Sequence, residues 1–125
     1  MEVVKDNRPE LSKKGKPMSK TFFGQIGRLK PEKIAEYREM HLSPWPELLD
    51  LIRECNITNY SIFLHGDIAF SYFEYIGEDY DADMERMAQS PVMQHWWTFS
   101  KPCFVQFAFD SAQFYCDMER VFYTT

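Results

Sequence analysis

Hydrophobic and polar positions in this chain follow two periods, one typical of strands and one typical of helices. The run TFFGQIGRL predicts a first strand from Thr21. The run ITNYSIFLH predicts a second strand that alternates, with one face made of Tyr60, Ile62 and Leu64 and the other of Asn59, Ser61, Phe63 and His65. After a tight turn at Gly66-Asp67, the run IAFSYFEYI returns as its partner, with one face made of Phe70, Tyr72 and Glu74. These two runs predict a β-hairpin.

Helical spacing fills the intervals between these strands. Pro31 suits a first helical turn and predicts a helix over 31–41. After a break at 42–44, Ser43 is the expected N-cap of a second helix, whose predicted core stripe is Trp45, Leu48, Leu49, Ile52 and Cys55. Further helices are expected from Asp79 and again from Ser90-Pro91, where Ser90 is the cap. Residues 102–112 show no clear period, and the run FYCDMERVFY predicts a last strand over 114–123.

The resulting order, β(α)ββ(α)β, predicts an α+β fold with a ferredoxin-like, four-stranded antiparallel sheet and helices on one face. The uncovered face would display many aromatic side chains, so we expect a second copy to cover it and form a homodimeric α+β barrel. Residues 1–20 read as a flexible N-terminal arm, because Pro, Gly, Ser and charge interrupt any period. Residues 21–125 are then one domain.

Composition and charge narrow the functional classes. The net charge of −5 gives no reason to expect nucleic acid or a membrane surface as partner. No apolar stretch is long enough to span a membrane, and the N-terminus lacks the apolar core of a signal peptide. The three cysteines fit free thiols in a reducing cytoplasm. The three histidines are far apart and outside metal-binding motifs, so we expect no metal.

Tyr37 and His41 are the first candidate functional residues. They stand four apart, on one face of the predicted helix. A histidine titrates near neutral pH and can act as a general acid or base without a metal. Its place at a helix C-terminus favours the protonated ring and a position facing a cleft. The structural alternative is a capping histidine beside a core tyrosine.

Three further features suit a polar ligand with an apolar face. Trp96 and Trp97 point about 100° apart on a helix, so one is expected to pack inward and the other to meet a partner, a lid or a ligand. Tyr60 adds a polar-tipped aromatic on a strand, which ordinary hairpin packing also explains. Glu74 lies in an apolar alternation and becomes an acid/base candidate if it points inward, or a solvated carboxylate if it lies at a strand end.

Together these residues resemble the L-rhamnose mutarotase family over about 21–125. The matching motifs are EYREMH (36–41), WPEL (45–48), NYSIFL (59–64), QHWW (94–97) and VFY (121–123). The resemblance implies His41 as proton donor and Tyr37, Tyr60, Trp96 and Trp97 as contacts to a monosaccharide, with no cofactor. Pro44 stands one place later than the family's usual proline, and Arg120 replaces a usual acidic residue.

The implied reaction is the interconversion of α and β anomers of a 6-deoxy aldose such as L-rhamnose. The ring opens when a proton reaches the ring oxygen and another leaves the anomeric hydroxyl. His41 is the expected acid, while Glu74, water and a tyrosine remain open as the base. The alternatives are a mutarotase for another sugar such as L-fucose, a cofactor-free or haem-dependent enzyme on the same fold, and a non-catalytic sugar-binding dimer.

Overall fold

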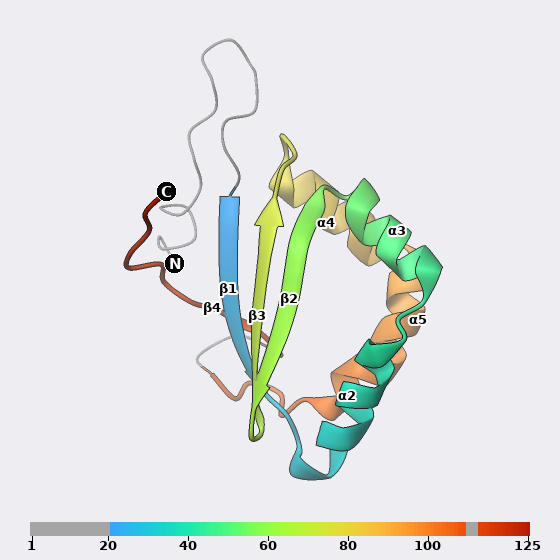
Figure 1. Cartoon of the computed structure of the whole chain (residues 1–125). Coiled ribbons are helices and arrows are strands. Elements are labelled where there is room, and N and C mark those ends of the chain that lie inside the picture. Colours follow the sequence, from blue (N-terminus) through green and yellow to red (C-terminus); the bar gives the residue numbers. More distant parts are fainter. Residues whose placement is uncertain (1–20, 110–112) are drawn as a thin grey trace.

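The computed structural model describes residues 21–109 and 113–125, so the predicted arm at 1–20 lies outside the described residues. These described residues form one sheet, and their helices all lie on one of its faces (Figure 1). The elements are, in chain order, β1 (Thr21–Arg28), the 3-10 turn η1 (Pro31–Lys33), α2 (Ile34–Leu42), α3 (Pro46–Glu54), β2 (Ile57–His65), β3 (Ile68–Tyr75), α4 (Tyr80–Gln89), α5 (Pro91–Ser100), the 3-10 turn η2 (Lys101–Cys103) and β4 (Cys116–Asp117).

The sheet confirms the predicted fold class. Its strand order is β2-β3-β1-β4 and every pairing is antiparallel, which is the ferredoxin-like arrangement. The predicted hairpin is present, and Gly66 provides the positive φ of +59° that its two-residue turn requires. The pairing shifts by one residue between Thr58 and Ser61, where Asn59 has a φ of +49°. This bulge turns Ile57 and Tyr60 to the helix-covered side together.

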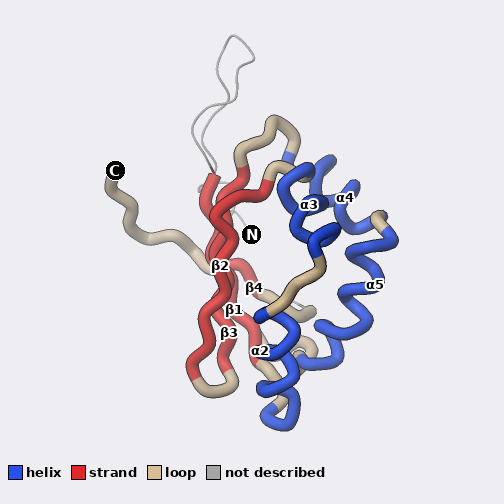
Figure 2. Tube along the Cα trace, turned by 45° about the vertical axis from the view of Figure 1, so that its right-hand side comes forward, coloured by secondary structure: helices blue, strands red, loops and turns tan. Residues whose placement is uncertain are grey.

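The helices form a single layer against the sheet (Figure 2). The predicted cap of α5 is confirmed, because the Ser90 side chain accepts a hydrogen bond from the Val92 N–H; Asp79 caps α4 in the same way. The predicted Ser43 cap is wrong. Helix α3 begins at Pro46 with Trp45 at the N-cap, and Ser43 instead ends α2. Pro46 at the first position fixes this start, since it needs no N–H partner there.

The predicted core stripe of α3 is only partly core. Leu48 and Cys55 are buried, as expected. Leu49 and Ile52 instead line an open cavity between α3 and the sheet. A helical period identifies the face that points toward the sheet, but it does not show whether the sheet closes on that face.

The predicted last strand over 114–123 is largely wrong. Of these ten residues only Cys116–Asp117 pair with β1, and the side chains of Val121 and Phe122 are 84% and 78% exposed. In the part of the chain that the structure describes, no helix covers the other side of the sheet, which exposes Phe63, Phe70 and Tyr72. Within the described residues, the helices are all too short or too polar to cross a bilayer.

Candidate functional site

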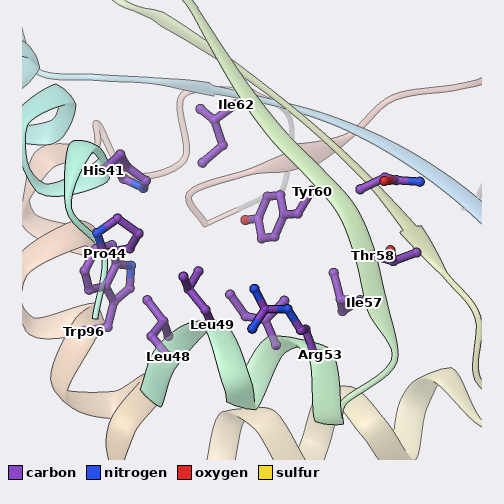
Figure 3. A pocket seen from close by; sticks show the side chains of 12 residues that line it. His41, Pro44, Leu48, Leu49, Arg53, Ile57, Thr58, Tyr60, Ile62 and Trp96 are labelled. Carbon is purple, nitrogen blue, oxygen red and sulfur yellow. The ribbon is translucent and has the colours of Figure 1, made fainter. Parts of the chain in front are cut away.

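A cleft between the helices and the sheet is the candidate site. It has an outer half of about 570 Å³ toward α3 and β2 and an inner half of about 360 Å³ toward α5. Both volumes fall in the range of roughly 300–1,000 Å³ that is typical of small-molecule sites. The two halves share six residues: His41, Leu48, Ile52, Tyr60, Ile62 and Trp96. Figure 3 shows His41 and Trp96 at one end of the outer half, with Tyr60 pointing into it from β2.

The geometry of His41 fixes its tautomer. Its Nδ1 lies 2.7 Å from the backbone carbonyl oxygen of Tyr37, one turn earlier in α2. A carbonyl oxygen only accepts, so Nδ1–H donates and Nε2 of the neutral ring has a free lone pair. Burial lowers the pKa of His41, and the hydrogen bond to the carbonyl offsets this only in part. Burial therefore acts against the protonated ring that a place at the helix C-terminus favours.

Three phenols converge on the inner half. The Tyr37 hydroxyl lies 2.7 Å from the Tyr115 hydroxyl, and Tyr60 lines the same space. Burial raises the pKa of Tyr37, and the neighbouring Tyr115 raises it further. Burial also raises the pKa values of Tyr60 and Tyr115. Tyr60 is 43% exposed, and its ring points into the cleft. All three hydroxyls are therefore neutral hydrogen-bonding groups at physiological pH.

The adjacent tryptophans divide as predicted. Trp96 is 8% exposed and packs edge-on against the His41 ring at a centroid distance of 5.5 Å and against Trp45 at 5.1 Å. Trp97 is half-buried, and the Lys101 ammonium lies 3.9 Å from its ring centroid. Both line the inner half. One face of Trp97 is thus covered by a cation, which leaves less of this ring for a sugar than the sequence suggested.

Glu74 is not brought together with the other candidates. It lies on the opposite face of the sheet, where its carboxylate accepts hydrogen bonds from Asn59 at 2.8 Å and Tyr72 at 2.6 Å. Neither half of the cleft is lined by Asp or Glu among the described residues. His, Cys, Asp and Glu side chains in the described part of the chain form no group of three that could hold a metal ion.

The two departures from the family pattern fall in different places. Pro44 lines the outer half of the cleft, beside His41. Arg120 instead stacks over Phe22 and Tyr123, at 5.2 and 4.7 Å from their ring centroids. Phe22 pairs with Glu74 and so lies on the helix-free face of the sheet. Of these two residues, Pro44 therefore lines the candidate site and Arg120 does not.

Sequence reasoning missed several lining residues, chiefly Arg53, Thr58, Lys101, Gln113 and Tyr115. One feature of the sequence, the glycine at position 27, could have indicated where Tyr115 lies. Gly27 sits inside β1, where a glycine often marks a close approach of another segment. A Cβ there would lie 2.7 Å from a ring carbon of Phe104 and 2.9 Å from the carbonyl oxygen of Phe114. The lack of a side chain at Gly27 therefore leaves room for the segment around Phe114, which positions Tyr115.

Fold and cleft together define a ferredoxin-like α+β protein with a small-molecule cavity built around one histidine and three phenols. A sequence model of the L-rhamnose mutarotase family matches residues 23–124. The chain therefore belongs to the L-rhamnose mutarotase family, as its motifs predicted.

Individual relatives agree with this assignment. The chain is 37% identical over 70 residues to an L-rhamnose mutarotase of Jannaschia sp. and 38% identical over 72 residues to one of Burkholderia orbicola. These alignments cover 56% and 58% of this chain, and 66% and 68% of the relatives' length.

Solved structures show the same fold. An L-rhamnose mutarotase from Formosa agariphila matches with a TM-score of 0.65 at 23% identity, over 83% of this chain and 98% of that one. A protein from Caulobacter crescentus, assigned to antibiotic biosynthesis monooxygenases, matches with a TM-score of 0.53 at 11% identity, over 80% and 88% of the two chains. At these identities the likeness concerns the fold alone.

Proposed function

We propose that this chain interconverts the α and β anomers of L-rhamnose. The observation that supports this most is the position of His41, whose Nδ1 is held by the Tyr37 carbonyl so that Nε2 is free, at the junction of two cavity halves lined by hydroxyls, tryptophans and aliphatic side chains. A sugar ring has an apolar face and a rim of hydroxyls, which matches this mixture. Family membership supplies the reaction, and the site contains a group able to perform it.

One residue can move every proton that the reaction needs. Nε2 of neutral His41 takes the proton from the anomeric hydroxyl O1 as the C1–O5 bond breaks and C1=O1 forms. The imidazolium returns this proton to the ring oxygen O5. Rotation about C1–C2 then exposes the other carbonyl face, and O5 attacks C1 while the proton passes from O5 through Nε2 back to O1. His41 therefore serves as both the proton donor and the base that the sequence left open, and no carboxylate is needed.

The three phenols and the aliphatic wall have separate roles in binding. The phenols, kept neutral by burial, hold ring hydroxyls. Leu48, Ile52 and Ile62 line both cavity halves and form an apolar wall for the methyl group at C6. A CH₂OH group in that position would bury a hydroxyl without a partner.

This predicts a preference between two sugars that differ only at C6. L-mannose is L-rhamnose with a hydroxyl added to the methyl group. We expect kcat/KM for L-rhamnose to exceed that for L-mannose by about tenfold, the effect of one poorly satisfied buried hydroxyl. Saturation transfer between α and β anomeric protons measures both rates, and L-fucose serves as a second 6-deoxy sugar. Equal rates for L-rhamnose and L-mannose would refute the methyl pocket.

We also propose that the chain is a cytoplasmic homodimer. The helix-free face of the sheet supports the dimer, because Phe63 and Phe70 are 64% and 38% exposed on it and a second copy would cover them. Cys55, Cys103 and Cys116 are free thiols, which supports a reducing compartment.

Phe63→Glu is expected to convert the dimer to a monomer, because it puts a charge into the proposed interface. Light scattering coupled to size exclusion should give twice the 14.9 kDa chain mass for the wild type and that mass itself for the variant. Phe99→Glu is the matched control, since Phe99 is 47% exposed on the helix layer. A wild-type monomer, or dissociation caused by Phe99→Glu instead, would contradict the proposed interface.

A further inference from the structure

Tyr115 lines the cleft and lies outside the family motifs. Its hydroxyl lies 2.7 Å from that of Tyr37, and both rings line the inner half of the cavity with His41. We propose that Tyr115 is a substrate-binding residue that acts with Tyr37 as one recognition element, reading a single ring hydroxyl of the sugar. This inference rests on the proposed function, because it concerns the ligand of that same site.

Counting donors shows why the pair acts as a unit. Each phenol has one O–H donor. One of the two O–H groups is used between the phenols, so the pair has one O–H left to offer to a ligand. Burial raises the pKa of both phenols, so neither loses this proton near neutral pH. The pair therefore presents a fixed, uncharged donor, which suits the oxygen of a neutral hydroxyl.

Packing holds this donor in place relative to the catalytic ring. Phe104 contacts Tyr37 and Tyr115 edge-on, at centroid distances of 5.3 and 5.0 Å. Tyr37 in turn fixes His41 through its carbonyl oxygen and lies against the imidazole at 4.4 Å. One packed cluster, made of Phe104, the two phenols and His41, therefore fixes the distance between the recognised hydroxyl and the anomeric carbon. This arrangement offers a physical basis for distinguishing L-rhamnose from L-fucose, whose methyl groups are alike but whose ring hydroxyls are oriented differently.

The test removes a hydroxyl group from the protein, from the sugar, or from both, and compares the resulting affinities. Dissociation constants are measured by NMR titration for L-rhamnose and its 2-, 3- and 4-deoxy analogues, with the wild type, Tyr115→Phe, Tyr37→Phe and the double variant. We expect the wild type to bind one deoxy analogue about tenfold more weakly than L-rhamnose, the loss of one hydrogen bond. Tyr115→Phe should bind L-rhamnose about tenfold more weakly and no longer distinguish that analogue.

Two further readouts separate recognition from structure. KM should rise in Tyr115→Phe while kcat changes less, because the contact is made equally before and during ring opening. The loss of affinity for L-rhamnose in the double variant should be smaller than the product of the fold-losses in the two single variants, since the phenols share one function. Tyr72→Phe, which removes a phenol hydroxyl on the other face of the sheet, should leave binding unchanged. Phenylalanine keeps the ring contact with Phe104, and thermal melting checks that each variant folds.

Each possible outcome decides the inference. Tyr115→Phe that binds and discriminates like the wild type, or that weakens all four sugars equally, would overturn it. If the wild type binds the sugars without exchanging their anomers, the proposed function fails, but the binding comparison still decides the role of Tyr115. If the wild type binds none of them, both proposals fail.

Discussion

Replacing His41 with alanine is expected to lower the enzyme-dependent rate of anomer exchange by roughly 10²–10⁴-fold, the usual contribution of general acid–base catalysis. The reason is geometric. Histidine is the side chain suited to proton transfer without a metal, and the Nδ1–H bond of His41 to the Tyr37 carbonyl leaves Nε2 free for the proton. Saturation transfer on L-rhamnose measures the rate. His65→Ala, at the exposed end of β2, is the control and should behave as the wild type.

The pH profile of the wild type tests the same residue independently. Because Nε2 must accept a proton, the neutral ring is the active form, and burial lowers its pKa below the ordinary value near 6.5. Activity should therefore fall as the pH drops through this lowered pKa and stay level above it. A proton donor that starts as imidazolium would show the opposite slope. Full activity in His41→Ala, or a rate that rises toward acid, would refute the shuttle.

Trp96→Ala is expected to lower the free energy of unfolding by roughly 3–5 kcal/mol, the usual cost of truncating a buried aromatic side chain to alanine. Trp96 is 8% exposed in a cluster with Leu48 and Met93, and its loss would leave a cavity between α3 and α5. It would also remove the edge contact that supports the His41 ring. Urea unfolding followed by circular dichroism gives the stability, and exchange of L-rhamnose gives the activity.

Trp97→Ala provides the matched control for this prediction. Trp97 is only half-buried, so the loss of stability should be smaller, while KM for L-rhamnose should rise because its ring lines the inner cavity. Equal destabilisation by the two substitutions would contradict the division between an inward tryptophan and a cavity-lining one.

Much of the fold was predictable because local patterns agree with the final packing. The alternation over 57–65 and 68–76 identified the hairpin, and Ser90-Pro91 identified the start of α5. The prediction of a last strand over 114–123 failed because, apart from Cys116–Asp117, these residues have no partner strand in the described part of the chain. The Val121–Tyr123 side chains are exposed instead, and a hydrophobic run alone does not show what covers it.

The sequence predicted the relative positions of site residues only where both residues lie in the same helix. Tyr37 and His41 share a helix face, and Trp96 and Trp97 share a helix, so their relation followed from the helical period. Tyr115 is 78 residues from Tyr37, and no local pattern predicts a contact over that distance. The placement of Glu74 depended on strand register against β1, which decides the face that its side chain occupies.

The most direct test of the account is saturation transfer between the α and β anomeric protons of L-rhamnose at neutral pH, with and without the wild-type chain. Exchange should accelerate in proportion to the concentration of the wild-type chain, and the same concentrations of His41→Ala should give roughly 10²–10⁴-fold less acceleration. No acceleration for L-rhamnose at any protein concentration would contradict the account.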